Sequence, residues 1–231
     1  VGQKQGEIWG YETYGLFQSE QEIAGAANQD KVSGGIKLMP GDIRFVDRNN
    51  DGVIDWGDNT VDNPGDKKII GNSTPRYHYG INLGADWKGF DLGIFFQGVG
   101  KRDLYLPGTS FRSHYGSEWQ VPSAYNNDYW TEENTGAYFP RARFNGGSAI
   151  NQAQTRYMVD ASYCRLKSVS IGYTLPKVLT QKASIEKIRI YFTGENLFTI
   201  SDTPDGLDPE LDNPYTYPMQ RSLSVGLSLT F

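Results

Sequence analysis

Alternation of apolar and small polar residues is the clearest pattern in the chain, and it is strongest at the carboxyl end. In residues 222–231 every second position is apolar, and the positions between them are Ser, Gly or Thr. Successive side chains of a β-strand point to opposite sides, so the pattern predicts a strand with one apolar and one polar face. About 9 to 11 residues also suffice for a tilted strand to cross the apolar layer of an outer membrane.

The same alternation recurs earlier in the chain. It covers residues 77–87, 90–97, 168–174 and 188–193. Lys88 and Gly89 separate the first two segments, which predicts a β-hairpin with a tight turn. Gly, Ser, Thr and Asn dominate the positions between the apolar residues, as a water-filled interior allows. The chain is therefore expected to be all-β and antiparallel.

The connections between these segments alternate in length. Residues 88–89 and 176–186 are short connections, whereas 99–160 and 200–219 are long. Outer-membrane barrels have short periplasmic turns and long extracellular loops. This order favours the strands of a transmembrane β-barrel with long extracellular loops, although a long functional loop in a soluble domain would look similar.

Composition excludes several other classes. Mean hydropathy is -0.55, and no apolar run approaches the ~20 residues of a transmembrane helix, a test that barrel strands escape because only alternate residues face lipid. The net charge of -5, without a Lys/Arg cluster, argues against a nucleic-acid partner. With two histidines and no nucleophile elbow, Walker loop or dinucleotide fingerprint, the sequence predicts no enzyme. The single Cys164 excludes an internal disulfide framework.

Several short motifs follow one another along nearly the whole chain. They are Trp9-Gly10-Tyr11, Gly15-Leu16-Phe17, Gly41-Asp42-Ile43, Tyr163-Cys164-Arg165-Leu166-Lys167, Gly172-Tyr173-Thr174-Leu175-Pro176, Gly194-Glu195-Asn196-Leu197-Phe198-Thr199 and Leu207-Asp208-Pro209-Glu210. In order and spacing they resemble the C-terminal portion of SusC/RagA family TonB-linked outer membrane transporters. Cys164 departs from the Leu that is usual in this family.

The resemblance implies a barrel of about 22 strands around an N-terminal plug, located in the cell outer membrane. Such transporters import large nutrients, glycans or oligopeptides, together with a SusD-like surface lipoprotein. On this basis residues 1–76 are expected to form an extracellular loop region, and residues 77–231 the C-terminal strands and loops. The expected partners are the rest of the barrel and plug, the lipoprotein, membrane lipid, and the TonB complex through an N-terminal region that this chain lacks.

The sharpest chemical motif is the acidic segment 47–58. Its spacing of oxygen-bearing residues around Gly52 matches a calcium loop of the EF-hand type, with a shorter carboxylate at the last position. The spacing predicts a structural calcium ion. Its expected ligands are Asp47, Asn49, Asp51, the Val53 carbonyl and Asp58. A solvated acidic turn is the alternative.

Aromatic residues crowd the long connection at 99–160. Trp119, Tyr125 and Trp130 are candidates for contact with a substrate or partner, and packing within the loop is the alternative. A second function class also remains: a soluble, calcium-stabilised β-sandwich that binds carbohydrate. The two classes differ in where the apolar strand faces point, because a barrel exposes them and a sandwich buries them. The residues expected to face lipid are Tyr79, Ile81, Leu83, Leu92, Ile94, Ile190, Leu223, Val225 and Leu227.

Overall fold

The computed structural model describes residues 2–106, 127–143, 147–181, 184–211 and 216–231. The chain forms two compact units. Residues Val1–Thr74 and Asp103–Val159 make the first, here called the loop unit, and Pro75–Arg102 and Asp160–Phe231 make the second, the sheet unit. The described residues between 103 and 159, a range that connects two strands of the sheet unit, therefore belong to the same unit as the N-terminal residues.

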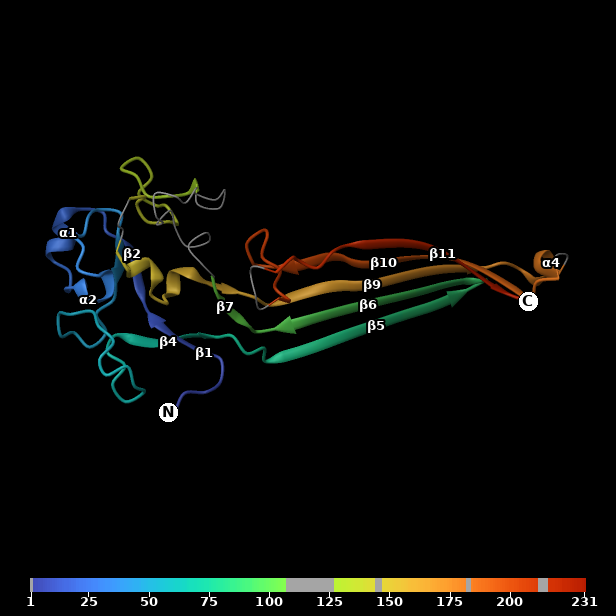
Figure 1. Cartoon of the computed structure of the whole chain (residues 1–231), viewed down its shortest axis with the longest axis horizontal. Helices are drawn as coiled ribbons and strands as arrows, with labels where there is room; N and C mark the ends of the chain where they lie inside the picture. The colour runs from blue at the N-terminus through green and yellow to red at the C-terminus, as the bar shows by residue number, and fades with distance from the viewer. Residues whose placement is uncertain (1, 107–126, 144–146, 182–183, 212–215) are drawn as a thin grey trace. The chain divides into compact units, whose positions relative to one another are not determined.

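The sheet unit is one antiparallel sheet of five strands, drawn side by side in Figure 1. Its order is β11 (Ser222–Thr230), β10 (Lys187–Ser201), β9 (Tyr163–Thr174), β6 (Phe90–Gly100) and β5 (Tyr77–Trp87). Each strand pairs with the next strand of this sheet along the chain, so the sheet is a simple meander. The predicted all-β, antiparallel fold is confirmed, and β9 and β10 extend beyond the alternating segments that predicted them.

The β5–β6 hairpin turns through the predicted Lys88-Gly89 pair. Both residues have positive φ, 48° and 90°, which a two-residue type I′ turn requires at both central positions. A Cβ atom on Gly89 would lie 2.8 Å from the Thr174 carbonyl oxygen. Glycine is thus needed here both for the backbone angle and for the close approach of β9.

The loop unit is built from short elements. Strand β1 (Glu7–Tyr11) pairs with β4 (Lys67–Asn72), and β2 (Thr13–Leu16) pairs with β3 (Ile43–Phe45). The remaining elements of the chain are α1 (Glu20–Ala24), α2 (Asp30–Ser33), β7 (Asp103–Tyr105) paired with β8 (Met158–Asp160), the 3-10 turns η2 (Ala149–Asn151) and η3 (Thr155–Tyr157), and α4 (Lys177–Thr180).

A small core holds these elements of the loop unit together. Its fully buried apolar side chains include Tyr11, Phe17, Val32, Ile54 and Tyr157. They come from segments far apart in the sequence, so packing rather than local propensity fixes this unit. Among the described residues, no helix is long and apolar enough to cross a membrane.

Candidate functional site

The apolar face of the sheet unit is open. Leu83, Leu223, Val225 and Leu227 are 53%, 62%, 78% and 60% exposed, and the other residues predicted to face lipid are exposed except Ile94, which is half-buried. Alternate strand residues supply this face, and a β-sandwich would have buried them against a second sheet. A contiguous apolar surface of this kind marks a contact with lipid or protein.

Aromatic residues border this apolar face at the hairpin end. Trp87 pairs with Phe90, and Phe90 with Tyr173 on β9. The Phe90 and Tyr173 ring centroids are 4.5 Å apart, and Lys88 Nζ lies 5.0 Å from the Trp87 ring. Aromatic rings with a nearby lysine are typical of the level where a membrane meets water.

The opposite face of the sheet is polar and carries its own ion pair. Arg189 on β10 donates to both oxygens of Asp91 on β6, at 2.9 and 2.5 Å. Its guanidinium also lies 4.8 Å from the Tyr191 ring centroid. The pair crosses β9 at Gly172, where a Cβ atom would be 2.5 Å from both partners. The missing side chain of Gly172 therefore allows the bridge.

A bulge in β9 determines which side chains lie on this polar face in the part of the sheet farther from the Lys88-Gly89 turn. Ser168 pairs with Phe95 and Leu166 with Phe96, so Lys167 has no partner on β6. One extra residue reverses the alternation beyond that point. Without the bulge, Arg165 and Lys167 would share the apolar face of Val169; with it they lie on the polar face.

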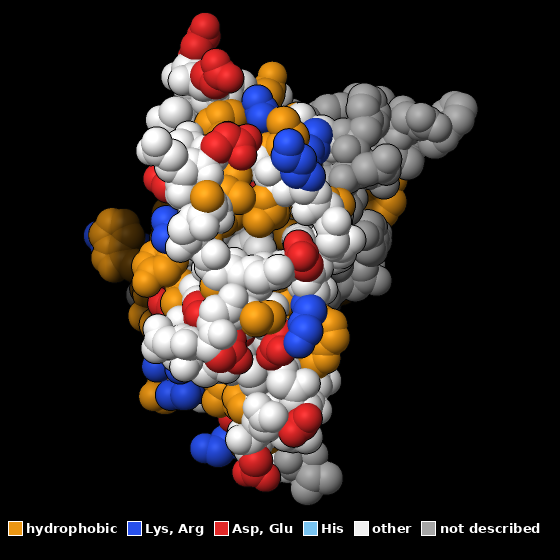
Figure 2. All heavy atoms as spheres, turned by 90° about the vertical axis from the view of Figure 1, so that its left-hand side faces the viewer, with side chains coloured by type: hydrophobic (Ala, Val, Ile, Leu, Met, Phe, Trp, Pro, Cys, Tyr) orange, Lys and Arg blue, Asp and Glu red, His pale blue; other side chains and the backbone are white. Residues whose placement is uncertain are grey.

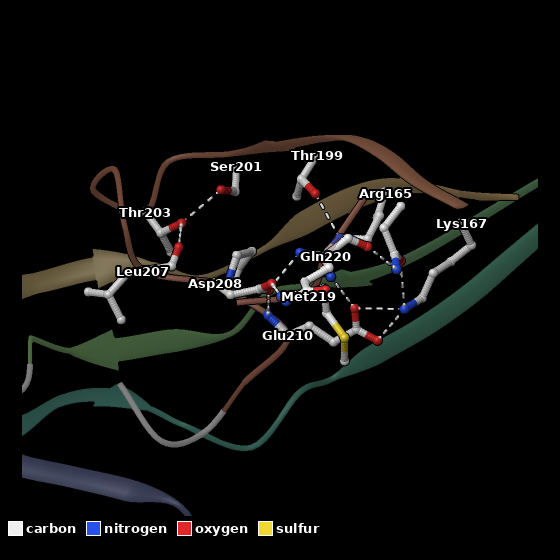
Figure 3. A network of polar contacts seen from close by, with 12 residues as sticks. Arg165, Lys167, Thr199, Ser201, Thr203, Leu207, Asp208, Glu210, Met219 and Gln220 are labelled. Atoms are coloured by element: carbon white, nitrogen blue, oxygen red, sulfur yellow. Dashed lines mark hydrogen bonds and ion pairs between the residues drawn. The ribbon is translucent and has the colours of Figure 1, made fainter. Parts of the chain in front are cut away.

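Arg165 and Lys167 form a charged clamp with two carboxylates of the segment after β10 (Figure 3). Arg165 donates to Asp208 Oδ1 at 2.6 Å, to Glu210 Oε2 at 2.5 Å and to Thr199 Oγ1 at 2.7 Å. Lys167 Nζ lies 2.8 Å from Glu210 Oε1. Figure 3 shows both basic side chains converging on Glu210. We call Arg165, Lys167, Asp208 and Glu210 the charged clamp.

The charged clamp is largely removed from solvent. The Arg165 and Asp208 side chains are 4% and 5% exposed. Burial acts to raise the pKa of Asp208, but hydrogen bonds from Arg165 and from the backbone N–H groups of Glu210 and Met219 outweigh it, so the pKa lies below its usual value. The clamp thus ties the 202–219 connection to the sheet at neutral pH.

The sequence motifs contained these residues without revealing the contact. Arg165-Leu166-Lys167 and Asp208-Pro209-Glu210 each place two like charges two positions apart, with opposite signs in the two motifs. This complementarity is the one signal that could have paired them. The alternation along the strand predicts the opposite, because it places Arg165 and Lys167 on the same face as the apolar residues of β9.

The acidic segment 47–58 is a tightly hydrogen-bonded loop. Both oxygens of Asp47 accept backbone N–H groups, from Asn50 at 2.7 Å and Gly52 at 2.9 Å. Asn49 and Asp51 each accept the N–H group two residues further on. Side-chain oxygens that turn back on the loop in this way also occur in calcium loops, but they equally stabilise a loop without an ion.

Further hydrogen bonds engage side chains at the predicted ligand positions. Asp58 accepts a hydrogen bond from Asn63 at 2.9 Å, and Asn49 Nδ2 donates to Asp51 at 2.8 Å. Fully buried Asp66 bridges the loop by accepting N–H groups of Arg48 and Asp55, both at 2.8 Å. Across the described ranges, no three His, Cys, Asp or Glu side chains converge as a metal site. Calcium therefore remains a prediction.

The three candidate aromatic residues have different positions. Trp119 and Tyr125 lie outside the described residues. Trp130 is 3% exposed, donates to Gln18 Oε1 at 3.2 Å and has the Arg141 guanidinium 5.1 Å from its ring. Gly41 is also close, since a Cβ atom there would be 2.6 Å from the indole. This position suits packing within the loop unit.

Known proteins resemble the chain over most of its length. TonB-dependent receptor P3 of Formosa agariphila is 31% identical over 248 residues, covering all of this chain and 22% of that protein. TonB-dependent receptor SusC of Bacteroides thetaiotaomicron is 29% identical over 194 residues, covering 81% of this chain and 17% of that protein. No family model matches.

A solved structure agrees with these relatives. The structure of the RagAB peptide transporter superimposes on this chain with a TM-score of 0.65 at 22% sequence identity. The match covers 97% of this chain and 23% of the RagAB chain. The chain is a SusC/RagA-like portion of a TonB-dependent receptor. It corresponds to their C-terminal portion and spans about a fifth of the length of the relatives it matches. Receptors of this kind are outer-membrane proteins, and that is the location of this SusC/RagA-like chain.

Proposed function

We propose that this SusC/RagA-like chain is part of a TonB-dependent outer-membrane transporter that imports large nutrients, glycans or oligopeptides, and not an enzyme. The observation that carries the proposal is the two-faced antiparallel sheet, whose open apolar face suits lipid and whose polar face suits a water-filled interior. The end-to-end similarity to TonB-dependent receptors supports it. The soluble β-sandwich is not favoured, because the apolar strand faces are exposed.

The rest of the barrel and plug are the first proposed partners. Strands β5 and β11 are the two edges of the sheet, and β5 is exposed along its whole length. Unpaired strand edges carry free N–H and C=O groups that bind further strands. We infer that neighbouring barrel strands of the same receptor occupy these edges, and that the plug lies against the polar face.

The loop unit and the 202–219 connection are proposed to lie outside the cell. They connect to the strand ends that lie opposite the short Lys88-Gly89 turn, and in barrels of this kind the short turns are on the periplasmic side. A SusD-like lipoprotein is the proposed partner there, and the TonB complex the partner on the periplasmic side. RagAB, which has a similar fold, is a peptide transporter, and this supports an oligopeptide as one of the proposed classes of cargo.

Deletion of the receptor gene tests the transport proposal. The deletion strain should lose uptake of a large glycan or oligopeptide while uptake of the matching monosaccharide or amino acid is unchanged, because small solutes cross through general porins. Fluorescently labelled substrate measures uptake, and complementation with the intact gene is the control. Uptake of large substrates that survives the deletion, with no related receptor expressed, would contradict the proposal.

Calcium bound to the 47–58 loop remains a proposal of its own. The supporting observation is the inward-turned carboxylate of Asp47, with Asn49 and Asp51 following at alternate positions. Binding would require Asp58 to exchange its hydrogen bond with Asn63 for the ion. The ion would then stiffen a loop outside the cell, where millimolar calcium fills even weak sites.

Calcium removal tests this proposal. With a dissociation constant of about 0.1 to 1 mM, typical of extracellular sites, 10 mM calcium should stabilise the purified receptor by about 1.4 to 2.7 kcal/mol over EDTA. Thermal unfolding measures the difference, with magnesium for comparison. Asp51→Asn should remove it, and Asp62→Asn, outside the loop, should not. Identical unfolding of the unmodified receptor in calcium and EDTA would exclude the site.

A further inference from the structure

Two adjoining hollows in the loop unit share one wall. Their volumes are about 350 and 400 Å³. The shared wall consists of Tyr14, Gly15, Gly136, Ala137 and Arg156. This wall combines one aromatic ring, the backbone of two glycines and one cation. None of these groups has yet been given a role in the proposed transport.

Tyr14 presents an aromatic ring to solvent beside a cation. The residue is 71% exposed, and the Arg44 guanidinium lies 5.2 Å from its ring centroid. Arg44 is itself held between the Phe17 ring, at 5.8 Å, and Glu22, at 4.0 Å. One face of the Tyr14 ring is thus supported by a cation while the ring stays open to a ligand.

Bare backbone surrounds this ring. At Gly15 and at Gly136, no atom other than those of the adjacent residues lies within 4 Å of where a Cβ atom would stand. Gly15 needs glycine because its φ is +126°, but Gly136 has no left-handed backbone angle. Open space above a glycine that the backbone does not require is typical of a place where a ligand approaches closely.

Arg156 supplies a positive charge that no ion pair neutralises among the described residues. Its Nε and Nη2 atoms donate to the carbonyls of Tyr138 and Ala137, at 2.5 and 2.7 Å. In the part of the chain that the structure describes, no carboxylate lies within 4.0 Å of its guanidinium. Burial lowers the pKa of Arg156, and the more distant Asp128 carboxylate offsets this only in part, so the guanidinium charge would gain from an anion in direct contact.

We propose that this wall is a binding subsite for an acidic oligosaccharide. A sugar ring stacks on Tyr14, a ligand carboxylate pairs with Arg156, and Glu22 and Asp128, which line the two hollows, accept hydroxyl groups. One exposed ring among charged groups matches the flat faces and hydroxyls of sugars better than the apolar side chains of a peptide. The inference rests on the proposed import of large nutrients and names their class.

The distribution of charge on the surface bears on how an acidic sugar would be recognised. On the face of the molecule drawn in Figure 2, acidic and basic side chains are interspersed and hydrophobic side chains form small groups. Such a surface gives no broad field of one sign to attract a polyanion. Affinity for an acidic sugar would then depend on individual contacts such as those of Tyr14 and Arg156.

Calorimetry on the purified whole receptor tests the subsite. The probes are tetragalacturonic acid, neutral maltotetraose and tetraglutamate. We expect tetragalacturonic acid to bind most tightly, and Tyr14→Ala to weaken it about ten-fold through loss of stacking, whereas Tyr14→Phe keeps it. Gly136→Leu should abolish binding by filling the hollow. Tyr217→Ala, which truncates an 88% exposed tyrosine of the sheet unit, is the matched control.

The remaining outcomes overturn the proposal. Unchanged affinity in both Tyr14→Ala and Gly136→Leu would refute the site, and equal binding of maltotetraose or tetraglutamate would refute the ligand class. Binding is measured without membrane transport, so it is independent of the gene-deletion experiment. Receptor-dependent uptake without tetragalacturonic acid binding would refute the subsite and leave the proposed transport function standing.

Discussion

Arg165→Ala in the whole receptor is expected to reduce the free energy of unfolding by about 3 to 5 kcal/mol, the usual cost of removing one partner from a buried ion pair. The substitution leaves the Asp208 carboxylate, 5% exposed, without its main cation, and deprives Glu210 of one of two. Urea unfolding in detergent measures the loss. Limited proteolysis should show faster cleavage within 202–219, because the charged clamp no longer ties that segment to β9.

Control variants separate the charged clamp from a general loss of charge. Arg221→Ala removes an exposed arginine that has no ion pair among the described residues, and should change stability by less than about 0.5 kcal/mol. The loss of stability in Arg165→Lys should lie between those of Arg165→Ala and Arg221→Ala. An ammonium group cannot reach Asp208, Glu210 and Thr199 with the fork geometry of a guanidinium. Equal stability of Arg165→Ala and Arg221→Ala would mean that the clamp contributes nothing.

Low pH should also weaken the charged clamp, because it protonates Asp208. The pKa of Asp208 is lower in the folded chain than its usual value, so its contribution to stability is complete above a pH of about 4 and disappears as the pH falls through the folded value. The unmodified receptor should therefore lose more stability than Asp208→Asn between pH 5 and pH 2.

Leu83→Arg is expected to cost about 2 to 4 kcal/mol of folding free energy in a bilayer, the range for arginine near the midplane on the lipid face of a barrel. Leu83 is in the middle of β5 and 53% exposed on the apolar face. Its neighbour Asn82 points to the opposite, polar face, so Asn82→Arg is a matched control with a small expected effect. Refolding into lipid vesicles, followed by gel mobility of unheated samples, measures both variants.

Refolding the same variants into detergent micelles distinguishes lipid contact from protein packing. Leu83→Arg should be tolerated better in short-chain detergent micelles than in bilayers, because micelles deform around a charge. If Leu83→Arg folds in bilayers as well as Asn82→Arg does, this face does not meet lipid.

The long strands could be predicted because their information is local. Residues 77–87 and 222–231 alternate without interruption, and the structure places strands at Tyr77–Trp87 and Ser222–Thr230. The Lys88-Gly89 turn likewise needs only two residues of known backbone preference. The short pairings of the loop unit, such as β1 with β4, escaped prediction because each strand has few residues and its partner is about 60 residues away.

The sequence by itself determined that this chain forms an antiparallel sheet with one apolar and one polar face, because side-chain alternation follows directly from strand geometry. Only the tertiary structure decided that Lys167 is a bulge, which moved Arg165 from the apolar to the polar face and into contact with Asp208 and Glu210. A bulge depends on the registers of two neighbouring strands at once, and an ion pair across some 40 residues depends on how a loop returns to the sheet. Neither is recorded in the local order of residues, since both are fixed by packing among distant segments.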